Sequence, residues 1–197
     1  MKKLKVSAGI WFLGATSDRF VKQGYRPDTT IEERFKLAAS VPGVGGLEMH
    51  YPSEVTDANY KDLKQLADDL GMRIVQFCPH LWIDPRWKFG QFSNPDPQLR
   101  QQALDLAKRT TDLAQYMEAE VMVYWPAQDG YDYPFQIDHR QRLDHLVEGL
   151  AAWVEYMPTQ KIVLEYKAFE PRTHIMLPTI GHCMTIINEI NRPNLGI

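Results

Sequence analysis

The sequence predicts an α/β fold built on a parallel sheet, because short apolar runs alternate with amphipathic helical segments along its 197 residues. Such a sheet is either closed as a barrel or open and doubly wound. No Gly-rich phosphate loop follows the first run, which is unfavourable to a dinucleotide-binding open sheet. The predicted strands are Val6–Leu13, Gly46–His50, Arg73–Phe77, Glu120–Trp125, Lys161–Tyr166 and Leu195–Ile197.

The predicted helices between these strands carry their own start and stop signals. Thr29 with Glu32 forms a capping box, and Gly71 is a stop signal after a stripe of leucines. Asp96-Pro97 and Asp138 are start signals for two longer helices. The helices are therefore expected from Thr29 to about Ala39, from Tyr60 to Leu70, from Pro97 to about Met117, from Asp138 to about Tyr156 and from Thr179 to Ile190.

Composition excludes several classes of protein. The formal net charge of −3 is unfavourable to nucleic-acid binding, which needs a basic surface, and no segment has the length and apolarity of a membrane span. Cys78 and Cys183 have neither metal-like nor disulfide-like spacing, which suggests a reducing cytoplasm. The N-terminus imitates a signal peptide, but Ser7, Gly9 and Gly14 interrupt it, so a first buried strand is the better interpretation and secretion the weaker one.

The most informative motif follows the apolar run at residues 161–164. Glu165 and Lys167 are two residues apart, so in a strand their side chains would project from the same face. At the carboxyl end of a barrel strand, that face is where active sites assemble. A carboxylate suits a hard cation and an ammonium suits a developing oxyanion, which together favour metal-assisted chemistry on a sugar-like substrate. The alternative is a surface ion pair.

The residues around this pair point to a known family. Residues 165–172 read Glu-Tyr-Lys-Ala-Phe-Glu-Pro-Arg. This run resembles the fifth-strand signature of xylose isomerases, which reads Glu-Pro-Lys-Pro-x-Glu-Pro-Arg. Residues 177–182 and 191–193 match the family's next helix and its exit, 123–125 resemble its fourth strand, and 70–72 resemble the approach to its third. The similarity covers nearly the whole chain.

The resemblance implies a (β/α)8 TIM barrel, of which the chain covers about five and a half units. Residues 1–197 would be the N-terminal part of a single barrel domain, because Asn194–Ile197 match only the beginning of the family's sixth strand. A sheet that stopped there would leave an open edge, so we expect the chain to be a fragment or an incomplete record. Further metal ligands are then expected beyond Ile197, and residues 1–197 alone are expected to be inactive.

The resemblance also implies roles for charged residues. Glu165 would ligate a metal ion and Lys167 would stabilise the substrate's carbonyl oxygen. His50 would catalyse ring opening, although a histidine at a strand end is also a common structural residue. The family orients that histidine with an aspartate three residues later, whereas this chain has Ser53 there and Glu54 next, so the orienting partner stays open. A cis Glu170-Pro171 bond is expected, with Glu170 behind Lys167.

Aromatic residues at the strand ends would form the walls of the sugar site. Trp11 and Trp125 match pocket tryptophans of the family, and flat aromatic faces suit the C–H surfaces of sugars. His80 would be a pocket wall, or a competitor for the role of His50, with Trp82 as an aromatic lid. Phe20 lies where the family extends a phenylalanine into a neighbouring subunit, in keeping with a homodimer or homotetramer. We interpret Asp129 and Asp132 as residues of a turn, and His139 and His145 as solvated.

The function implied is a metal-dependent aldose–ketose isomerase for a simple sugar, using a 1,2-hydride shift. Its expected cofactor is divalent magnesium, manganese or cobalt, with two ions in the complete protein. One alternative is a ketose epimerase or another sugar-processing enzyme of the same barrel type, in which glutamates abstract protons. The other is a non-catalytic fragment or sugar-binding protein. Neither the sugar nor the metal is identified by the sequence.

Overall fold

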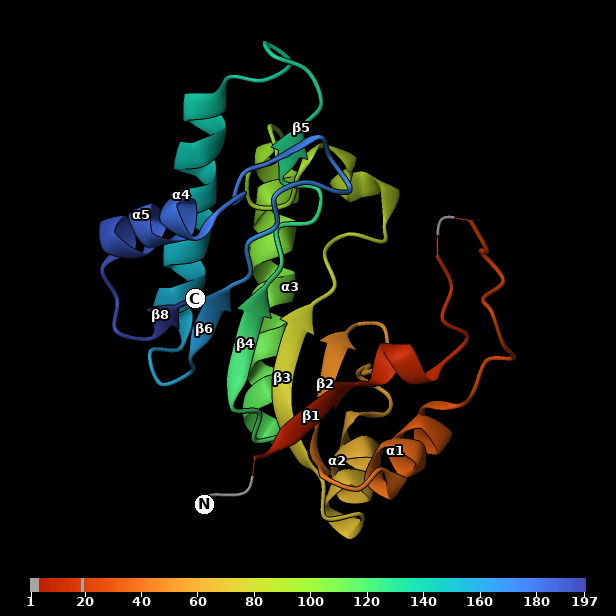
Figure 1. The fold of residues 1–197 in the computed structure, drawn as a ribbon. Coiled ribbons are helices and arrows are strands. Elements are labelled where there is room, and N and C mark those ends of the chain that lie inside the picture. The colour runs from red at the N-terminus through yellow and green to blue at the C-terminus, as the bar shows by residue number, and fades with distance from the viewer. Residues whose placement is uncertain (1–3, 19) are drawn as a thin grey trace. The chain divides into compact units, whose positions relative to one another are not determined.

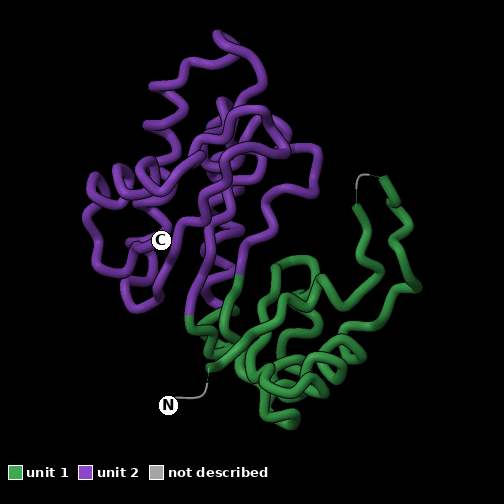
Figure 2. Tube along the Cα trace, viewed as in Figure 1, with its two compact units in different colours: residues 1–77, 113–120 green, residues 78–112, 121–197 purple. Residues whose placement is uncertain are grey.

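The structure is a computed structural model that describes residues 4–18 and 20–197. It divides into two compact units, shown in Figure 2. Unit 1 comprises residues 1–77 and 113–120, and unit 2 comprises residues 78–112 and 121–197. The single barrel domain expected from the sequence stays a prediction.

Unit 1 begins with two parallel strands joined through a helix. Strand β1 pairs with β2 in parallel, and the register sets Ser7 opposite Gly46 and Gly9 opposite Glu48. The order within the unit is β1-β2-β3, which follows the chain as in a barrel. The elements are β1 (Val6–Gly9), the 3-10 helix η1 (Ile10–Leu13), α1 (Ile31–Ser40), β2 (Val44–Tyr51), α2 (Tyr60–Asp69) and β3 (Arg73–Pro79), whose last two residues belong to unit 2 (Figure 1).

The core of unit 1 forms where α1 and α2 cover this sheet. Leu47 and Met49 of β2 are fully buried, as is Phe35 of α1. The apolar face of α2 contributes Leu63 and Ala67, which are 4% and 1% exposed. Helical spacing places those two residues on one side of α2, so burying them fixes which face of the helix meets the core.

Two predictions for unit 1 are wrong in detail. The capping box is formed by Thr30 and Glu33, not by Thr29 and Glu32: the Glu33 amide donates to the Thr30 hydroxyl, and Glu33 Oε2 accepts from the Thr30 amide at 2.8 Å. The strand expected over 6–13 ends at Gly9, and residues 10–13 form η1, because the chain turns inward at fully buried Ile10. Little of β1 itself is buried.

Unit 2 repeats the pattern of parallel strands in chain order. Strand β4 pairs in parallel with β6, and β6 pairs in parallel with β8. A two-stranded antiparallel ribbon of β5 and β7 was not expected from the sequence. The elements are η2 (Pro85–Phe89), α3 (Pro97–Tyr116), β4 (Val121–Tyr124), β5 (Gly130–Tyr131), α4 (His139–Tyr156), β6 (Ile162–Leu164), β7 (His174–Ile175), α5 (Ile180–Ile190) and β8 (Leu195–Gly196), with the end of α3 assigned to unit 1.

The core of unit 2 is centred on α4, beside which α5 lies in Figure 1. Trp153 of α4 is fully buried, and its indole N–H donates to the Thr111 hydroxyl of α3 at 2.8 Å. The Phe92 ring lies 6.0 Å from the Trp153 ring. Gly149 makes this approach possible, because a Cβ atom there would lie 2.9 Å from the Phe92 side chain. Helix α4 starts at the predicted cap, where the Asp138 carboxylate accepts from the Gln141 amide.

The segment after β6 differs from the expected strand and matches the expected turn. The strand predicted over 161–166 ends at Leu164, so Glu165 and Lys167 follow the strand and do not share its pleat. The Lys167 amide instead donates to the Leu177 carbonyl at 2.9 Å. The Glu170-Pro171 peptide bond is cis, which confirms that prediction.

Two predictions from composition concern the fold as a whole. Among residues 4–18 and 20–197, no helix combines the length and apolarity needed to span a membrane. Cys78 and Cys183 are both buried thiols outside any disulfide, and burial raises the pKa of the Cys183 thiol to about 11. Both thiols are therefore part of the packed interior.

Candidate active site

A histidine, a carboxylate and a tryptophan meet at the end of β2 in unit 1. His50 Nδ1 lies 3.0 Å from Glu54 Oε2, and its ring centroid lies 4.3 Å from that of Trp11. Trp11 reaches this position from η1 because Gly9 has no side chain: a Cβ atom there would lie 2.5 Å from the indole. This group, which we call the histidine cluster, contains the residue expected to open the sugar ring.

The structure places the Glu54 carboxylate in contact with the His50 imidazole. Glu54 Oε2 also accepts from the His50 amide and from the Ser53 hydroxyl, both at 2.9 Å. Burial raises the pKa of Glu54, but these bonds and the attraction of His50 outweigh it, so the net pKa is lowered. Ser53 stands three residues after His50, where the family has its aspartate, but its hydroxyl donates to the Glu54 carboxylate. The carboxylate that contacts the imidazole is that of Glu54.

The depressed pKa of Glu54 gives a test by pH. Glu54→Gln is expected to cost about 2 kcal/mol of unfolding free energy at pH 7, since a buried charged acceptor is lost. A lowered folded-state pKa means that this stabilisation is complete above the unfolded value near 4.5 and is lost as pH falls through the folded pKa. The difference should therefore shrink between pH 5 and 3. Urea unfolding across that range measures it.

Glu148→Gln is the control, because Glu148 is an exposed carboxylate in the middle of α4. Its cost should be small at every pH. A Glu54→Gln difference that stays constant from pH 7 to pH 3 would contradict the assigned role.

A second group of expected site residues lies in unit 2, and we call it the lysine cluster. Lys167 Nζ lies 5.2 Å from the centroid of the Trp125 ring, a cation–π distance, and 3.3 Å from Glu170 Oε2. The Trp125 ring in turn meets Trp82 edge-on, with centroids 4.6 Å apart. The Trp125 ring face and the Glu170 carboxylate both contact the Lys167 ammonium. The Lys167 side chain is half-buried, so part of it remains accessible to solvent.

The aromatic wall continues from Trp82 to His80. Their ring centroids are 4.1 Å apart, and both side chains are half-buried at the end of β3 and in the loop that follows. His80 therefore lies among the aromatic residues of the lysine cluster, as expected for a pocket wall. Its alternative role as the ring-opening base stays a prediction.

Glu165 and Phe20 are exposed in the structure. The Glu165 amide donates to the Tyr124 carbonyl at 3.0 Å, which extends the β4–β6 pairing by one residue. Phe20 is 76% exposed in the loop between η1 and α1. Within the described residues, no group of three or more His, Cys, Asp and Glu side chains is arranged to hold a metal ion. Glu165 is thus one candidate ligand, and a metal site needs further donors.

The interpretation of Asp129 as a turn residue misses its main contacts. Asp129 is fully buried, and its Oδ1 accepts from the Gln91 amide at 2.7 Å and the Ser93 amide at 2.9 Å. The Ser93 and Tyr124 hydroxyls also donate to this carboxylate. Burial raises the pKa of Asp129 despite these bonds. These hydrogen bonds connect the loop after η2 to the end of β4. The residues next to Asp129 in the sequence do not indicate this role.

Asp132 and His145 also differ from what the sequence suggested. The Asp132 carboxylate pairs with Arg172 Nη1 at 2.8 Å and accepts from the Thr173 amide at 3.0 Å, so it ties β5 to the start of β7. His145 is not fully solvated, because its Nδ1 is buried without a partner among the described residues. His139, in contrast, is exposed as expected.

The expected site residues therefore form two groups. Trp11, His50, Glu54 and Phe20 belong to unit 1, while His80, Trp82, Trp125, Glu165, Lys167 and Glu170 belong to unit 2. Within each unit, the ring and charge contacts described above bring most of these side chains together. Their convergence on a single cavity stays a prediction.

Comparison with known proteins identifies the family of this chain. A profile of the family described as Xylose isomerase-like TIM barrel matches residues 35–197. The xylose isomerase of Thermus thermophilus is 30% identical over 201 residues, which cover 94% of this chain and 51% of that protein. The chain thus spans about half the length of this curated relative.

Solved structures agree on the fold. An AP endonuclease, family 2, from Brucella melitensis has a TM-score of 0.69 at 14% identity, over 98% of this chain and 67% of that one. The 3-keto-D-glucoside 4-epimerase from E. coli has a TM-score of 0.63 at 12% identity, over 87% and 64%. The fold is α/β with a parallel sheet of the TIM-barrel type, and the chain belongs to the xylose isomerase-like TIM-barrel family.

Proposed function

We propose that the protein is a metal-dependent aldose–ketose isomerase that acts on a simple sugar. The observation that carries this proposal is the lysine cluster, in which Lys167 lies over the Trp125 ring and beside Glu170 after β6. The 30% identity to a xylose isomerase supports it, and that protein's name gives the reaction class.

Lys167 is the group that would stabilise charge on the substrate. During aldose–ketose interconversion, negative charge develops on the carbonyl oxygen, and a fixed ammonium next to that oxygen lowers the barrier. The contacts to Trp125 and Glu170 hold the Lys167 side chain before substrate arrives, so little reorganisation is needed during reaction. Glu170 acts through Lys167 and is a positioning residue.

The aromatic residues would bind the sugar and exclude water. The edge-on contact between Trp82 and Trp125 leaves ring surface suited to the C–H faces of a sugar. Displacing water from such a wall strengthens the electrostatic effect of Lys167, because charges interact more strongly at low dielectric.

His50 would transfer the proton that opens the cyclic sugar. Glu54 contacts Nδ1, so a proton held between these two atoms makes Nε2 the nitrogen that accepts from the sugar hydroxyl. Trp11 packs on the imidazole and fixes its plane. Glu54 and Trp11 therefore set the tautomer and the orientation of the base.

The set of metal ligands is the least complete part of the proposed site. Magnesium, manganese and cobalt sites collect several oxygen donors, whereas the described residues offer Glu165 without a cluster of three. The donors in this part of the chain do not by themselves fit a divalent cation, so no catalytic step is derived through one. The proposal assigns Glu165 as one ligand only.

The test is an isomerisation assay on the full-length gene product that contains residues 1–197. A panel of pentoses and hexoses, each with magnesium, manganese or cobalt, should give metal-dependent conversion of at least one sugar. Substrate deuterated at the migrating position should retain its label, as a 1,2-hydride shift requires. Complete loss of label to solvent would refute the hydride shift and favour the epimerase-like proton transfer.

Residues 1–197 alone are expected to be inactive and to bind no divalent cation with useful affinity, because a single carboxylate holds a hydrated ion weakly. The same assay and a metal titration measure both properties. Metal-dependent turnover by this segment would show that the ligands are misassigned. Sugar binding without turnover by the full-length product would support the sugar-binding alternative.

A further inference from the structure

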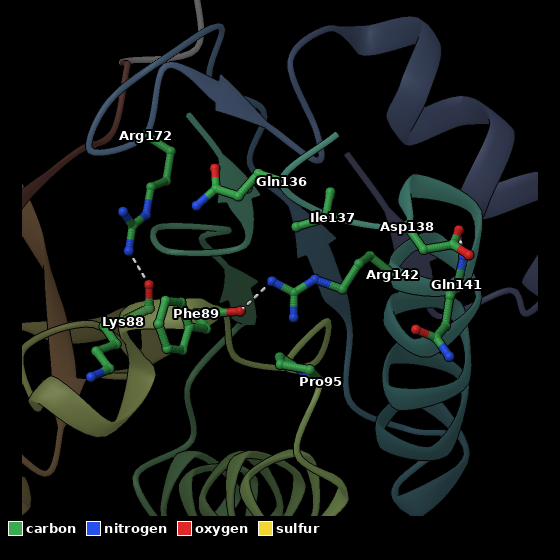
Figure 3. Close-up of a pocket in the computed structure, with 10 residues that line it drawn as sticks. Lys88, Phe89, Pro95, Gln136, Ile137, Asp138, Gln141, Arg142 and Arg172 are labelled. Carbon is green, nitrogen blue, oxygen red and sulfur yellow. Dashed lines mark hydrogen bonds between the residues drawn. The ribbon is translucent and has the colours of Figure 1, made fainter. Parts of the chain in front are cut away.

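A cavity in unit 2 contains none of the candidate active-site residues. Its volume is about 330 Å³, within the range of small-molecule sites. It lies between η2, the start of β5, the first turns of α4 and the residues after Pro171, as Figure 3 shows. The lining residues that carry charge are Lys88, Arg142, Arg172 and Asp138.

Arg142 is the residue that makes this cavity unusual. It is only 5% exposed, and its Nη2 donates to the Phe89 carbonyl at 2.6 Å. Its Nε and Nη1 atoms have no hydrogen-bond partner among the described residues. A buried guanidinium with unsatisfied N–H groups is costly, because desolvation is not offset by an acceptor. An anion in the cavity would supply the missing acceptors.

The surroundings of Arg142 are electropositive. Burial lowers the pKa of Arg142, and the nearby charges of Arg100 and Arg172 lower it further, against an opposing effect of Asp129. Asp129 already accepts four hydrogen bonds from Gln91, Ser93 and Tyr124, and the Nε and Nη1 atoms of Arg142 have no partner among the described residues. The guanidinium therefore lies in a field that attracts a further negative charge.

A second cation faces the same cavity. Arg172 enters from the opposite side in Figure 3, where it donates to the Lys88 carbonyl and pairs with Asp132. The exposed Lys88 side chain leaves η2 in the other direction in Figure 3, so Lys88 borders the cavity without aiming its ammonium into it. Asp138, the carboxylate in the lining, already accepts from the Gln141 amide as the cap of α4. Arg142, Arg172 and Lys88 outnumber Asp138 in the lining, so the formal charge of the lining is positive.

A neutral donor adds to this set. Gln136 accepts from the Asp132 amide with its Oε1 at 2.6 Å, which leaves its amide nitrogen directed toward the cavity in Figure 3. Arg142, Arg172 and Gln136 can all donate hydrogen bonds into the cavity, and two of them carry positive charge. This combination matches the acceptor oxygens of phosphate and carboxylate groups.

We propose that this cavity binds a small oxyanion, either a phosphate or a carboxylate group, with Arg142 as its principal donor. The site is independent of the proposed isomerase function, because it shares no residue with the histidine and lysine clusters. Its test consequently needs no assay of turnover.

Isothermal titration calorimetry on residues 1–197, at constant ionic strength, tests the proposal with sodium phosphate and with sodium malonate. Malonamide is the uncharged control ligand. Binding of phosphate alone would assign a phosphate group, and binding of malonate alone would assign a carboxylate. Malonamide should not bind. If neither anion binds, or if malonamide binds as well as malonate, the proposal is wrong.

Matched variants locate the site. Arg142→Gln should weaken anion affinity by at least about tenfold, as for a lost charge-assisted hydrogen bond, and Arg142→Lys by about threefold, because lysine keeps the charge but loses the guanidinium donors. Arg140→Gln is the control: it lies two residues from Arg142, pairs with Asp144 and has a side chain that is 82% exposed. Its affinity should equal that of the wild type.

Circular dichroism checks that each variant is folded. If Arg142→Gln fails to fold, Arg142→Lys decides the result, because it keeps a positive charge at this buried position. Equal affinities for Arg142→Lys and Arg140→Gln would overturn the proposal, as would an equal loss in all three variants.

Discussion

Replacing Lys167 by methionine in the full-length gene product is expected to lower turnover by about two to three orders of magnitude, as for the loss of one oxyanion donor. Methionine keeps much of the apolar stem over the Trp125 ring but removes the ammonium that lies 3.3 Å from Glu170. Sugar binding depends more on the tryptophan faces than on this charge. We therefore expect kcat to fall while KM stays close to the wild-type value.

Steady-state kinetics with the sugar identified by the panel measure this effect. Lys161→Met is the matched control, because Lys161 is exposed just before β6, at the opposite end of the strand from Lys167. It should keep wild-type kinetics. A Lys167→Met enzyme with unchanged kcat would remove Lys167 from the mechanism, while an equal loss in both variants would indicate a general effect on folding.

Replacing Asp129 by alanine is expected to lower the unfolding free energy by about 3 kcal/mol or more. The carboxylate is fully buried and accepts from the Gln91 amide, the Ser93 amide and two hydroxyls. Alanine would leave those buried donors without an acceptor, and each carries a desolvation cost. The loss should be largest in unit 2, which contains all of these residues.

Urea unfolding of residues 1–197 gives the magnitude, provided that the wild type unfolds in a single transition. Asp144→Ala is the control, because its carboxylate pairs with Arg140, whose side chain is 82% exposed. Such pairs contribute about 1 kcal/mol or less. Similar costs for the two variants would show that Asp129 is not the buried anchor described above.

The sequence predicted the features that depend on local pattern. The alternation of strands and helices is a matter of periodicity, and it gave the parallel pairs β1–β2, β4–β6 and β6–β8. The cap at Asp138 is likewise local, since its partner is the amide of Gln141. The cis bond at Glu170-Pro171 came from the family resemblance.

Features that depend on distant contacts were missed or misplaced. Asp129 binds the segment at Gln91 and Ser93, more than thirty positions earlier, so no local signal distinguishes it from an ordinary turn residue. The partner of His50 is decided by how the loop after β2 folds back, which spacing alone left open between Ser53 and Glu54. The end of the first strand depends on where Ile10 finds its core.

Gly9 shows how a residue without a side chain can control the position of Trp11, one of the aromatic residues proposed to bind the sugar. Its φ of −70° is available to any residue, so glycine is not required there for backbone freedom. The constraint is space, because the indole of Trp11 occupies the volume that a Cβ atom would take. A substitution at residue 9 would leave every reactive group in the chain unchanged and still tilt the surface beside His50. Substrate preference could therefore be altered through a residue that has no side chain.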